Sequence, residues 1–218
     1  LLSNTSGTLT FTGLTTNGGT GASLTGSNGG ATFNFSGVSI SSAANAGLVA
    51  TGGGTINVTG ATNTIASTTG TALNVANTSI GVNGLTFRSI SVTGNNTSPA
   101  NGIILNATGA NGLKVTGNGG ACTSATPTCT GGTIQGTGSH GVALTNVSNI
   151  EFNLFSIHNT GDHGIFGDGV NNFTLRDSYI FDFGNTAGAA VSEDAMHFES
   201  TNTANTAAGH GLTGTVII

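Results

Sequence analysis

The chain has 218 residues, of which only 5% are charged, and its formal net charge is −5 with three basic residues. So few cations exclude nucleic-acid binding, because a phosphate backbone is bound through many Lys and Arg contacts. The 38 glycines follow no Gly-X-Y period and are accompanied by only 2 prolines, which excludes collagen. No apolar run is long enough for a transmembrane helix, so we expect no membrane span.

Short apolar-x-apolar units recur down the chain from Leu9-Thr10-Phe11 onward, and we call them the leading track. The further units are Phe33-Asn34-Phe35, Ile56-Asn57-Val58, Leu85-Thr86-Phe87, Leu113-Lys114-Val115, Ile150-Glu151-Phe152, Phe173-Thr174-Leu175 and Val216-Ile217-Ile218. The steps from Phe33 to Ile56 and from Ile150 to Phe173 are both 23 residues, whereas several other steps are longer and require insertions in turns. Because side chains alternate along a strand, each unit buries two residues and exposes one.

Two more tracks accompany the first. A glycine track opens strands at Gly47, Gly70, Gly102, Gly141 and Gly164, with 23-residue steps from Gly47 to Gly70 and from Gly141 to Gly164. A following track, which comes directly after the leading one, consists of Ile90-Ser91-Val92, Thr133-Ile134, Ser156-Ile157 and Tyr179-Ile180. An antiparallel sandwich would not explain why the same 23-residue spacing occurs on two separate tracks.

One coil cannot bury its own apolar face, but a stack of coils can. The sequence therefore predicts an all-β, right-handed parallel β-helix with three short strands per coil, about 23 residues per coil and 8–9 coils. We interpret residues 1–218 as a single β-helix domain and a segment of a longer chain. A Cys-bracketed loop is inserted at residues 119–131.

The segment from Gly138 to Asp182 and the block at 111–149 show the repeat most clearly. Both resemble the right-handed parallel β-helix repeat proteins of bacteria, in the broad pectate-lyase-like group, which includes large repetitive secreted and surface proteins. The resemblance implies the fold. The same scaffold carries lyases, hydrolases, adhesins and inert stalks, so function has to be argued from the site.

Cys122 and Cys129 flank a short polar loop, and their separation suits a disulfide formed in an oxidising compartment. The alternative is two free thiols, while a zinc site would need further ligands and no His lies nearby in the sequence. We therefore expect an extracellular or cell-surface location.

All eight acidic residues lie between Glu151 and Glu199, and four of the five histidines fall in or beside that stretch. Aligning the coils on their glycines stacks His140 over His163 and gives two outward columns, namely Thr145, Asp168 and Glu199, and Ala143, Phe166 and His197. The candidate glycan contacts are His140, His163, Phe166 and Asp168. If the protein were an enzyme, acid–base chemistry would fall to Asp168, Asp194, His197 and Glu199. A His/Asp metal site is conceivable there, but we predict neither a metal nor a cofactor.

Catalysis receives little further support from the resemblance. Glycosidases of the polygalacturonase group show Asn-Thr-Asp, an Asp pair, Gly-His-Gly and Arg-Ile-Lys in that order. This chain has Glu193-Asp194 and Gly209-His210-Gly211, but it has neither Asn-Thr-Asp nor Arg-Ile-Lys. We therefore expect a protein that is not an enzyme.

The sequence favours a structural or adhesive building block of a bacterial extracellular fibre, filament or cell-surface protein. The predicted partners are another copy stacked end to end, or a continuation of the same chain, because the apolar pattern runs to both ends of the sequence. The alternative is a carbohydrate-binding or polysaccharide-cleaving β-helix that uses the acidic C-terminal face. Ice binding is a minor alternative, because Asn34, Lys114 and Glu151 interrupt the outward threonines.

Overall fold

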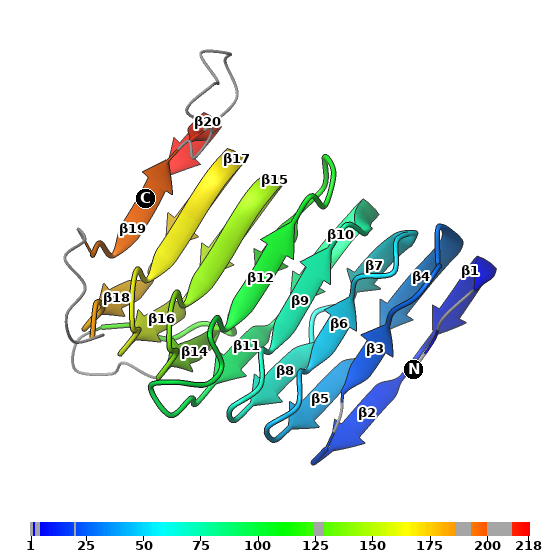
Figure 1. Cartoon of the computed structure of the whole chain (residues 1–218), viewed down its shortest axis with the longest axis horizontal. Coiled ribbons are helices and arrows are strands. Elements are labelled where there is room, and N and C mark those ends of the chain that lie inside the picture. Colours follow the sequence, from blue (N-terminus) through cyan, green and yellow to red (C-terminus); the bar gives the residue numbers. More distant parts are fainter. Residues whose placement is uncertain (1, 3–4, 20, 124–128, 186–192, 200–210) are drawn as a thin grey trace.

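The computed structural model describes residues 2, 5–19, 21–123, 129–185, 193–199 and 211–218. These residues form strands β1 to β20, which stack as a parallel β-solenoid of about 7 turns with about 25 residues per turn (Figure 1). The part of the chain that the structure describes holds no helix long and apolar enough to cross a bilayer.

The three predicted tracks are present as strands. The leading track consists of β1 (Ser6–Phe11), β4 (Gly30–Ser36), β7 (Thr55–Thr59), β10 (Ser79–Phe87), β13 (Leu113–Val115) and β20 (Leu212–Ile217). The following track consists of β2 (Leu14–Asn17), β5 (Val38–Ser42), β8 (Thr64–Ser67), β11 (Ser89–Val92), β14 (Gly132–Gln135), β16 (Phe155–His158) and β18 (Tyr179–Phe181). The glycine track consists of β3 (Ala22–Leu24), β6 (Leu48–Ala50), β9 (Leu73–Ala76), β12 (Ile103–Asn106) and β19 (Met196–Glu199).

Two long strands join two of these tracks into one sheet. Strands β15 (Val142–Asn153) and β17 (Ile165–Arg176) each run from the glycine track of one coil into the leading track of the next. The glycine and leading tracks therefore share a 13-stranded sheet, and the following track forms a separate 7-stranded sheet. Asn146 and Asn149 adopt positive φ inside β15, which lets the chain bend there without leaving the sheet.

The core consists of ladders of like residues between the two sheets. Leu9 pairs with Phe33 and Phe33 with Ile56, so one inward position is apolar in three successive coils. The largest fully buried side chains include Phe33, Phe87, Phe152, Phe155 and Phe173. Each coil therefore depends on its neighbours to keep its apolar face from water.

Backbone contact between coils explains the glycine track. A Cβ on Gly141 would lie 2.7 Å from the carbonyl oxygen of Gly164, and one on Gly164 would lie 2.6 Å from the carbonyl oxygen of Ala195. Both positions also press on an isoleucine of the following track, Ile157 and Ile180 respectively. Only glycine lets the chain of one coil approach the next this closely.

A buried asparagine fastens the turn between the leading and following tracks. The Oδ1 of Asn63 accepts a hydrogen bond from the backbone N of Val38 at 2.7 Å, and its Nδ2 donates to the carbonyls of Thr59 at 2.8 Å and Thr86 at 2.9 Å. One side chain thus connects three coils and satisfies backbone groups that would otherwise be buried without partners.

Three details of the sequence analysis need correction. The described chain has about 7 turns, not 8–9, because insertions raise the mean to about 25 residues per turn. Ile56 pairs with Ile80, not with Leu85, because residues 81–84 bulge out of β10 and shift the register. Gly70 does not open a strand, since β9 begins at Leu73, which pairs with Leu48.

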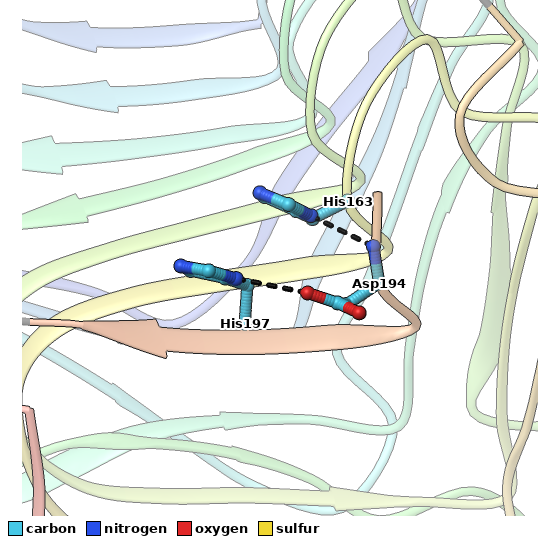
Figure 2. A group of neighbouring side chains, drawn as sticks. All are labelled: His163, Asp194 and His197. Carbon is cyan, nitrogen blue, oxygen red and sulfur yellow. Dashed lines mark hydrogen bonds and ion pairs between the residues drawn. The ribbon is translucent and has the colours of Figure 1, made fainter. Parts of the chain in front are cut away.

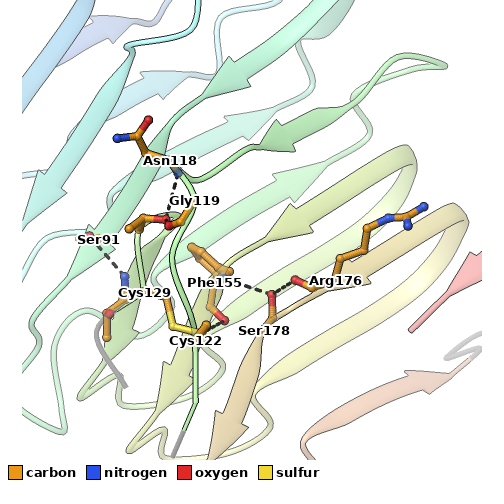
Figure 3. Close-up of a disulfide and its surroundings, with 10 residues drawn as sticks. Ser91, Asn118, Gly119, Cys122, Cys129, Phe155, Arg176 and Ser178 are labelled. Atoms are coloured by element: carbon orange, nitrogen blue, oxygen red, sulfur yellow. Dashed lines mark hydrogen bonds between the residues drawn. A yellow bond between two sulfur atoms is a disulfide. The ribbon is translucent and has the colours of Figure 1, made fainter. Parts of the chain in front are cut away.

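The Cys122–Cys129 disulfide lies in the loop between β13 and β14 (Figure 3). Its Cα atoms are 5.0 Å apart, within the usual range for a disulfide. Beside it, the Thr130 hydroxyl donates to the carbonyl of Gly119 at 2.8 Å and accepts from the backbone N of Asn118 at 2.9 Å. These bonds fasten the base of the inserted loop at 119–131, of which residues 124–128 lie outside the described part.

Replacing Phe152 by Ala is expected to lower the free energy of unfolding by about 3–5 kcal/mol. The ring is fully buried and stacks on Phe155 at a centroid distance of 4.9 Å. Guanidinium denaturation followed by circular dichroism measures the effect. Val82→Ala is the control, because Val82 is 86% exposed and its truncation should change stability by no more than about 0.5 kcal/mol.

Replacing both cysteines by Ser is expected to cost about 2.5 kcal/mol of unfolding free energy, because the open loop regains entropy in the unfolded chain. Reductant should lower the denaturation midpoint of the wild type and leave that of the double variant unchanged. Equal midpoints for oxidised and reduced wild type would contradict this role for the disulfide.

Candidate functional site

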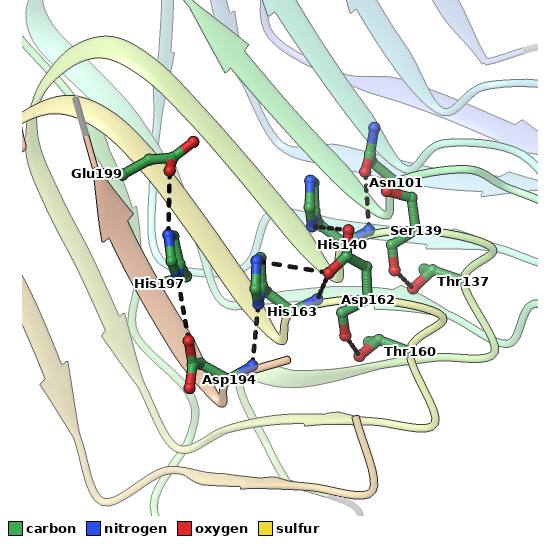
Figure 4. Close-up of polar contacts among 10 residues, drawn as sticks. All are labelled: Asn101, Thr137, Ser139, His140, Thr160, Asp162, His163, Asp194, His197 and Glu199. Atoms are coloured by element: carbon green, nitrogen blue, oxygen red, sulfur yellow. Dashed lines mark hydrogen bonds and ion pairs between the residues drawn. The ribbon is translucent and has the colours of Figure 1, made fainter. Parts of the chain in front are cut away.

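A repeated turn places histidines side by side at the start of two neighbouring strands. Residues 137–140 read Thr-Gly-Ser-His and residues 160–163 read Thr-Gly-Asp-His. In both turns the buried threonine hydroxyl donates to the carbonyl of the residue before the histidine, at 3.1 Å in the first and 2.7 Å in the second (Figure 4). The same local hydrogen bond occurs in both turns, and the rings of His140 and His163 that follow are parallel within 2°.

Four aromatic or imidazole rings form a parallel stack, which we call the histidine ladder: His140, His163, Phe166 and His197. Ring centroids are 5.4 Å apart between His140 and His163 and 4.5 Å apart between His163 and His197. The Phe166 ring packs on His140 at 4.8 Å. Interplanar angles within the ladder do not exceed 13°.

Carboxylates occupy the edges of the ladder. Asp162 lies between two rings, with its carboxylate oxygens 3.6 Å from His140 Nδ1 and 3.5 Å from His163 Nε2. His197 is held at both nitrogens, since its Nδ1 is 2.9 Å from Asp194 Oδ2 and its Nε2 is 3.3 Å from Glu199 Oε2. Figure 4 shows the three histidine rings side by side with these acidic groups at their edges.

The columns expected from the glycine alignment are present. Strand register pairs Ala143 with Phe166 and Phe166 with His197, and likewise Thr145 with Asp168 and Asp168 with Glu199. Asp168, however, is only 9% exposed, and His163 is only 7% exposed. Neighbouring coils cover both side chains, so of the candidate glycan contacts only His140 and Phe166 are partly open to solvent.

Asp162, which lies between His140 and His163, is a site residue that the sequence did not lead us to expect. The repeat of Thr-Gly-x-His at a 23-residue interval was the available signal, because it puts residue 162 beside His140 of the preceding coil. The Gly209-His210-Gly211 motif cannot be placed relative to the ladder, since residues 209 and 210 lie outside the described part.

Residue types that bind metals lie close together, but their ligand atoms do not point toward one common position. His163, Asp194 and His197 each offer a ligand atom, and these atoms lie within 4.8 Å of one another (Figure 2). Two imidazoles and a carboxylate suit zinc or a similar transition metal. Imidazole binds a metal in the plane of its ring, yet these two rings are parallel within 11° and 4.5 Å apart. One ion at the usual zinc–nitrogen distance of about 2.0–2.1 Å therefore cannot lie in the planes of both rings.

The candidate catalytic residues are also partly engaged. Asp194, His197 and Glu199 lie together, with Asp168 next to Glu199 in the register. A carboxylate at each ring nitrogen raises the pKa of His197 and so favours its protonated form, in which both nitrogens donate hydrogen bonds. This arrangement holds charge in place more readily than it transfers protons.

The local environment shifts the histidine pKa values in opposite directions. Burial lowers the pKa of His140 below 6.5, with the neighbouring His163 and His197 acting the same way and the Asp162 charge opposing them. For His197, the hydrogen bond that its ring donates to the Asp194 carboxylate raises the pKa above 6.5; burial opposes this, and Glu199 adds a smaller increase. The ladder thus favours a neutral ring at one end and a charged ring at the other.

Comparisons of the chain with protein-family models, with curated proteins and with solved structures find no match. The interpretation of the site therefore rests on its own geometry.

A proton NMR titration of the histidine ring signals tests these shifts. We expect His140 to titrate below pH 6.5 and His197 above it. Because unfolded His140 binds protons more readily, its contribution to stability is present above pH 6.5 and is lost on acidification. The His197 contribution has the opposite sign: it is present below pH 6.5 and is lost as the pH rises through the folded-state pKa. Asp194→Asn should lower the His197 midpoint, and an unchanged midpoint would contradict the assignment.

Proposed function

We propose that this chain is a structural, adhesive segment of a bacterial extracellular fibre, filament or cell-surface protein. The observation that supports the proposal is the parallel pairing of each coil with the next, which recurs from β1 to β20 in the described residues and buries one continuous apolar core between coils. At about 4.8 Å per coil, about 7 turns give a stiff body roughly 34 Å long. Such a body holds whatever it carries at a fixed distance from its point of attachment.

The surface chemistry supports an extracellular setting for this proposal. Disulfides persist in oxidising environments, and the Cys122–Cys129 pair is bonded. The outward positions are mostly hydroxyl and amide side chains. These keep the surface hydrated and offer few charged groups to which a ligand could bind. The bacterial assignment rests on the resemblance of the repeat to bacterial β-helix proteins.

The first coil supports stacking with a further coil. Among the described residues, β1 and β2 each pair with one neighbouring strand, so each has an edge that another strand can pair with, whereas Leu2 bridges to Leu24 on the corresponding edge of β3. Between these edges, Leu2, Phe11 and Leu14 line a cavity of about 170 Å³. A second copy, or another part of the same chain, would cover this apolar surface by adding strands in register.

Analytical ultracentrifugation and negative-stain electron microscopy test the stacking. We expect concentration-dependent elongated particles, because a coil seated on β1–β3 removes Phe11 and Leu14 from water. Phe11→Lys should abolish the association, whereas Thr10→Lys, which puts the same charge on the neighbouring outward position, should leave it intact. Compact monomers at all concentrations would count against end-to-end stacking of copies.

Carbohydrate binding or cleavage at the C-terminal face is the second candidate. It is favoured by partly exposed carboxylates at Asp194 and Glu199 beside partly exposed His140 and Phe166. The His163 ring has both faces covered by His140 and His197, so a sugar would be held by ring edges and carboxylates more than by stacking on this ring.

A glycan array tests the second candidate. Binding lost in the Asp168→Asn, Glu199→Gln double variant but retained in Glu151→Gln would support it. Glu151 carries the same chemical change at a distance from the ladder, where it pairs with Lys114 at 2.9 Å. Absence of binding to any glycan would reject it, and release of shortened oligosaccharides would show cleavage.

A further inference from the structure

Two aromatic side chains point outward from β18, in the 7-stranded sheet. Ile180 packs against the core, so alternation along the strand puts Tyr179 and Phe181 on the outer face, where both are partly exposed. Register places Tyr179 beside Ser156 and Phe181 beside His158 of the neighbouring strand β16 (Figure 1). Earlier strands of this sheet carry small or polar side chains at their outward positions, among them Ser39, Ser41, Thr133 and Gln135.

The two outward rings form one cluster with His158. Phe181 stacks on His158 with ring centroids 4.5 Å apart and an interplanar angle of 18°, and the Tyr179 ring lies 4.7 Å from Phe181 at 33°. We call these three residues the aromatic platform. Burial lowers the pKa of His158 below 6.5, and the charge of Asp182 opposes this shift. The neutral form of the imidazole is therefore favoured at pH 7.

A row of side-chain amides borders the platform at the ends of β16 and β18. Asn159 comes directly after β16, and its Nδ2 donates to Asn96 Oδ1 at 2.7 Å while its Oδ1 accepts from Asn185 Nδ2 at 3.0 Å. Asn185 Nδ2 also donates to the backbone carbonyl of Asp182, the first residue after β18, at 3.1 Å. These bonds use one of the two N–H groups of Asn159 and one of the two lone pairs on its oxygen, so hydrogen-bonding capacity remains beside the rings.

The combination of aromatic rings with amides points to one class of ligand. A pyranose has apolar C–H faces, which pack on aromatic rings, and a rim of hydroxyls, which pair with amides and carboxylates. A purely apolar partner would cover the exposed Asp182 carboxylate without replacing its hydration. An anionic glycan would be repelled by Asp182, and the platform itself offers it no positive charge. An uncharged sugar meets neither penalty.

We propose that the aromatic platform is a binding site for an uncharged glycan, with Tyr179 and Phe181 against a pyranose ring and the amide row and Asp182 along its hydroxyls. The platform lies on the 7-stranded sheet and the histidine ladder on the 13-stranded one, so this site is separate from the second candidate above. It gives a ligand class to the adhesive role and rests on the proposed function in that respect, whereas the stacking of copies does not depend on it.

Tyrosine fluorescence of the whole, unmodified chain tests the site. The sequence holds one Tyr and no Trp, so the emission reports on Tyr179 alone. The probes are neutral oligomers of glucose, mannose, galactose and N-acetylglucosamine, with oligogalacturonates as the acidic comparison. We expect a saturable change in emission with a neutral oligomer, at the same Kd that isothermal titration calorimetry gives. Binding without a change in emission, binding of the oligogalacturonates alone, or no binding at all would overturn the proposal.

Two substitutions remove the rings and keep the outward pattern of the sheet. Tyr179→Thr and Phe181→Gln introduce the side chains that Thr133 and Gln135 carry in the same columns two coils earlier. We expect the double variant to weaken binding of the neutral oligomer about tenfold or more, because the aromatic anchors are lost. Ser41→Gln, on the outer face of the same sheet, is the matched control and should leave the affinity unchanged.

Circular dichroism shows whether the double variant keeps the wild-type fold, and the fluorescence titration needs no variant. Unchanged affinity in a folded double variant would contradict the platform. If the double variant lost the elongated particles and the wild type bound no neutral oligomer, the rings would belong to an interface between copies, and the proposal would be rejected. Sedimentation of the wild type is measured without glycan, so failure of the platform and failure of the stacking are told apart.

Discussion

The structure depends on hydrogen bonds between parallel backbones of successive coils. A parallel ladder fixes the spacing of its strands and, in register, puts each side chain directly over its counterpart in the next coil. An apolar residue that recurs at one inward position therefore forms a continuous ladder in the core. A side chain at an outward position is likewise placed next to the side chain one repeat away. The packing of Gly141 on Gly164 and the side-chain hydrogen bonds of Asn63 both serve to keep that register. The histidine ladder is a consequence of the same constraint, because stacked coils bring His140, His163 and His197 face to face.

Most of the architecture could be predicted because the repeat consists of apolar residues and glycines at positions where few other residue types fit. Apolar-x-apolar units separated by 23 residues predicted the pairing of Phe33 with Ile56 and of Ile150 with Phe173, and the structure confirms both. The predicted strand register was wrong where the chain departs from the repeat and no distinctive residue type marks the departure. The bulge at 81–84 is made of ordinary turn residues, and Ala72 takes a position that glycine occupies in other coils. Insertions of this kind also explain the wrong number of coils.

The candidate site was predictable in its columns but not in its contacts. Register alone places Thr145, Asp168 and Glu199 in one column. Whether a side chain in such a column is open to water depends on the shape of its neighbours, which is why the burial of Asp168 and His163 was not foreseen. The bridging by Asp162 depends on the turn that precedes β17 and on the matching turn one coil earlier. Such a contact between two turns is set by local hydrogen bonds, and strand periodicity carries no information about it.

The distribution of charge along the chain has an electrical consequence. Arg88 is the only charged side chain among the first 113 residues, whereas all eight carboxylates lie between Glu151 and Glu199. Because chain order is also spatial order along the stack, the molecule is a dipole aligned with its long axis (Figure 1). Beside an anionic surface such a body experiences a torque that turns the acidic coils outward, and this torque acts over about 10 Å at 0.1 M ionic strength. Orientation would thus precede contact and would need no specific receptor.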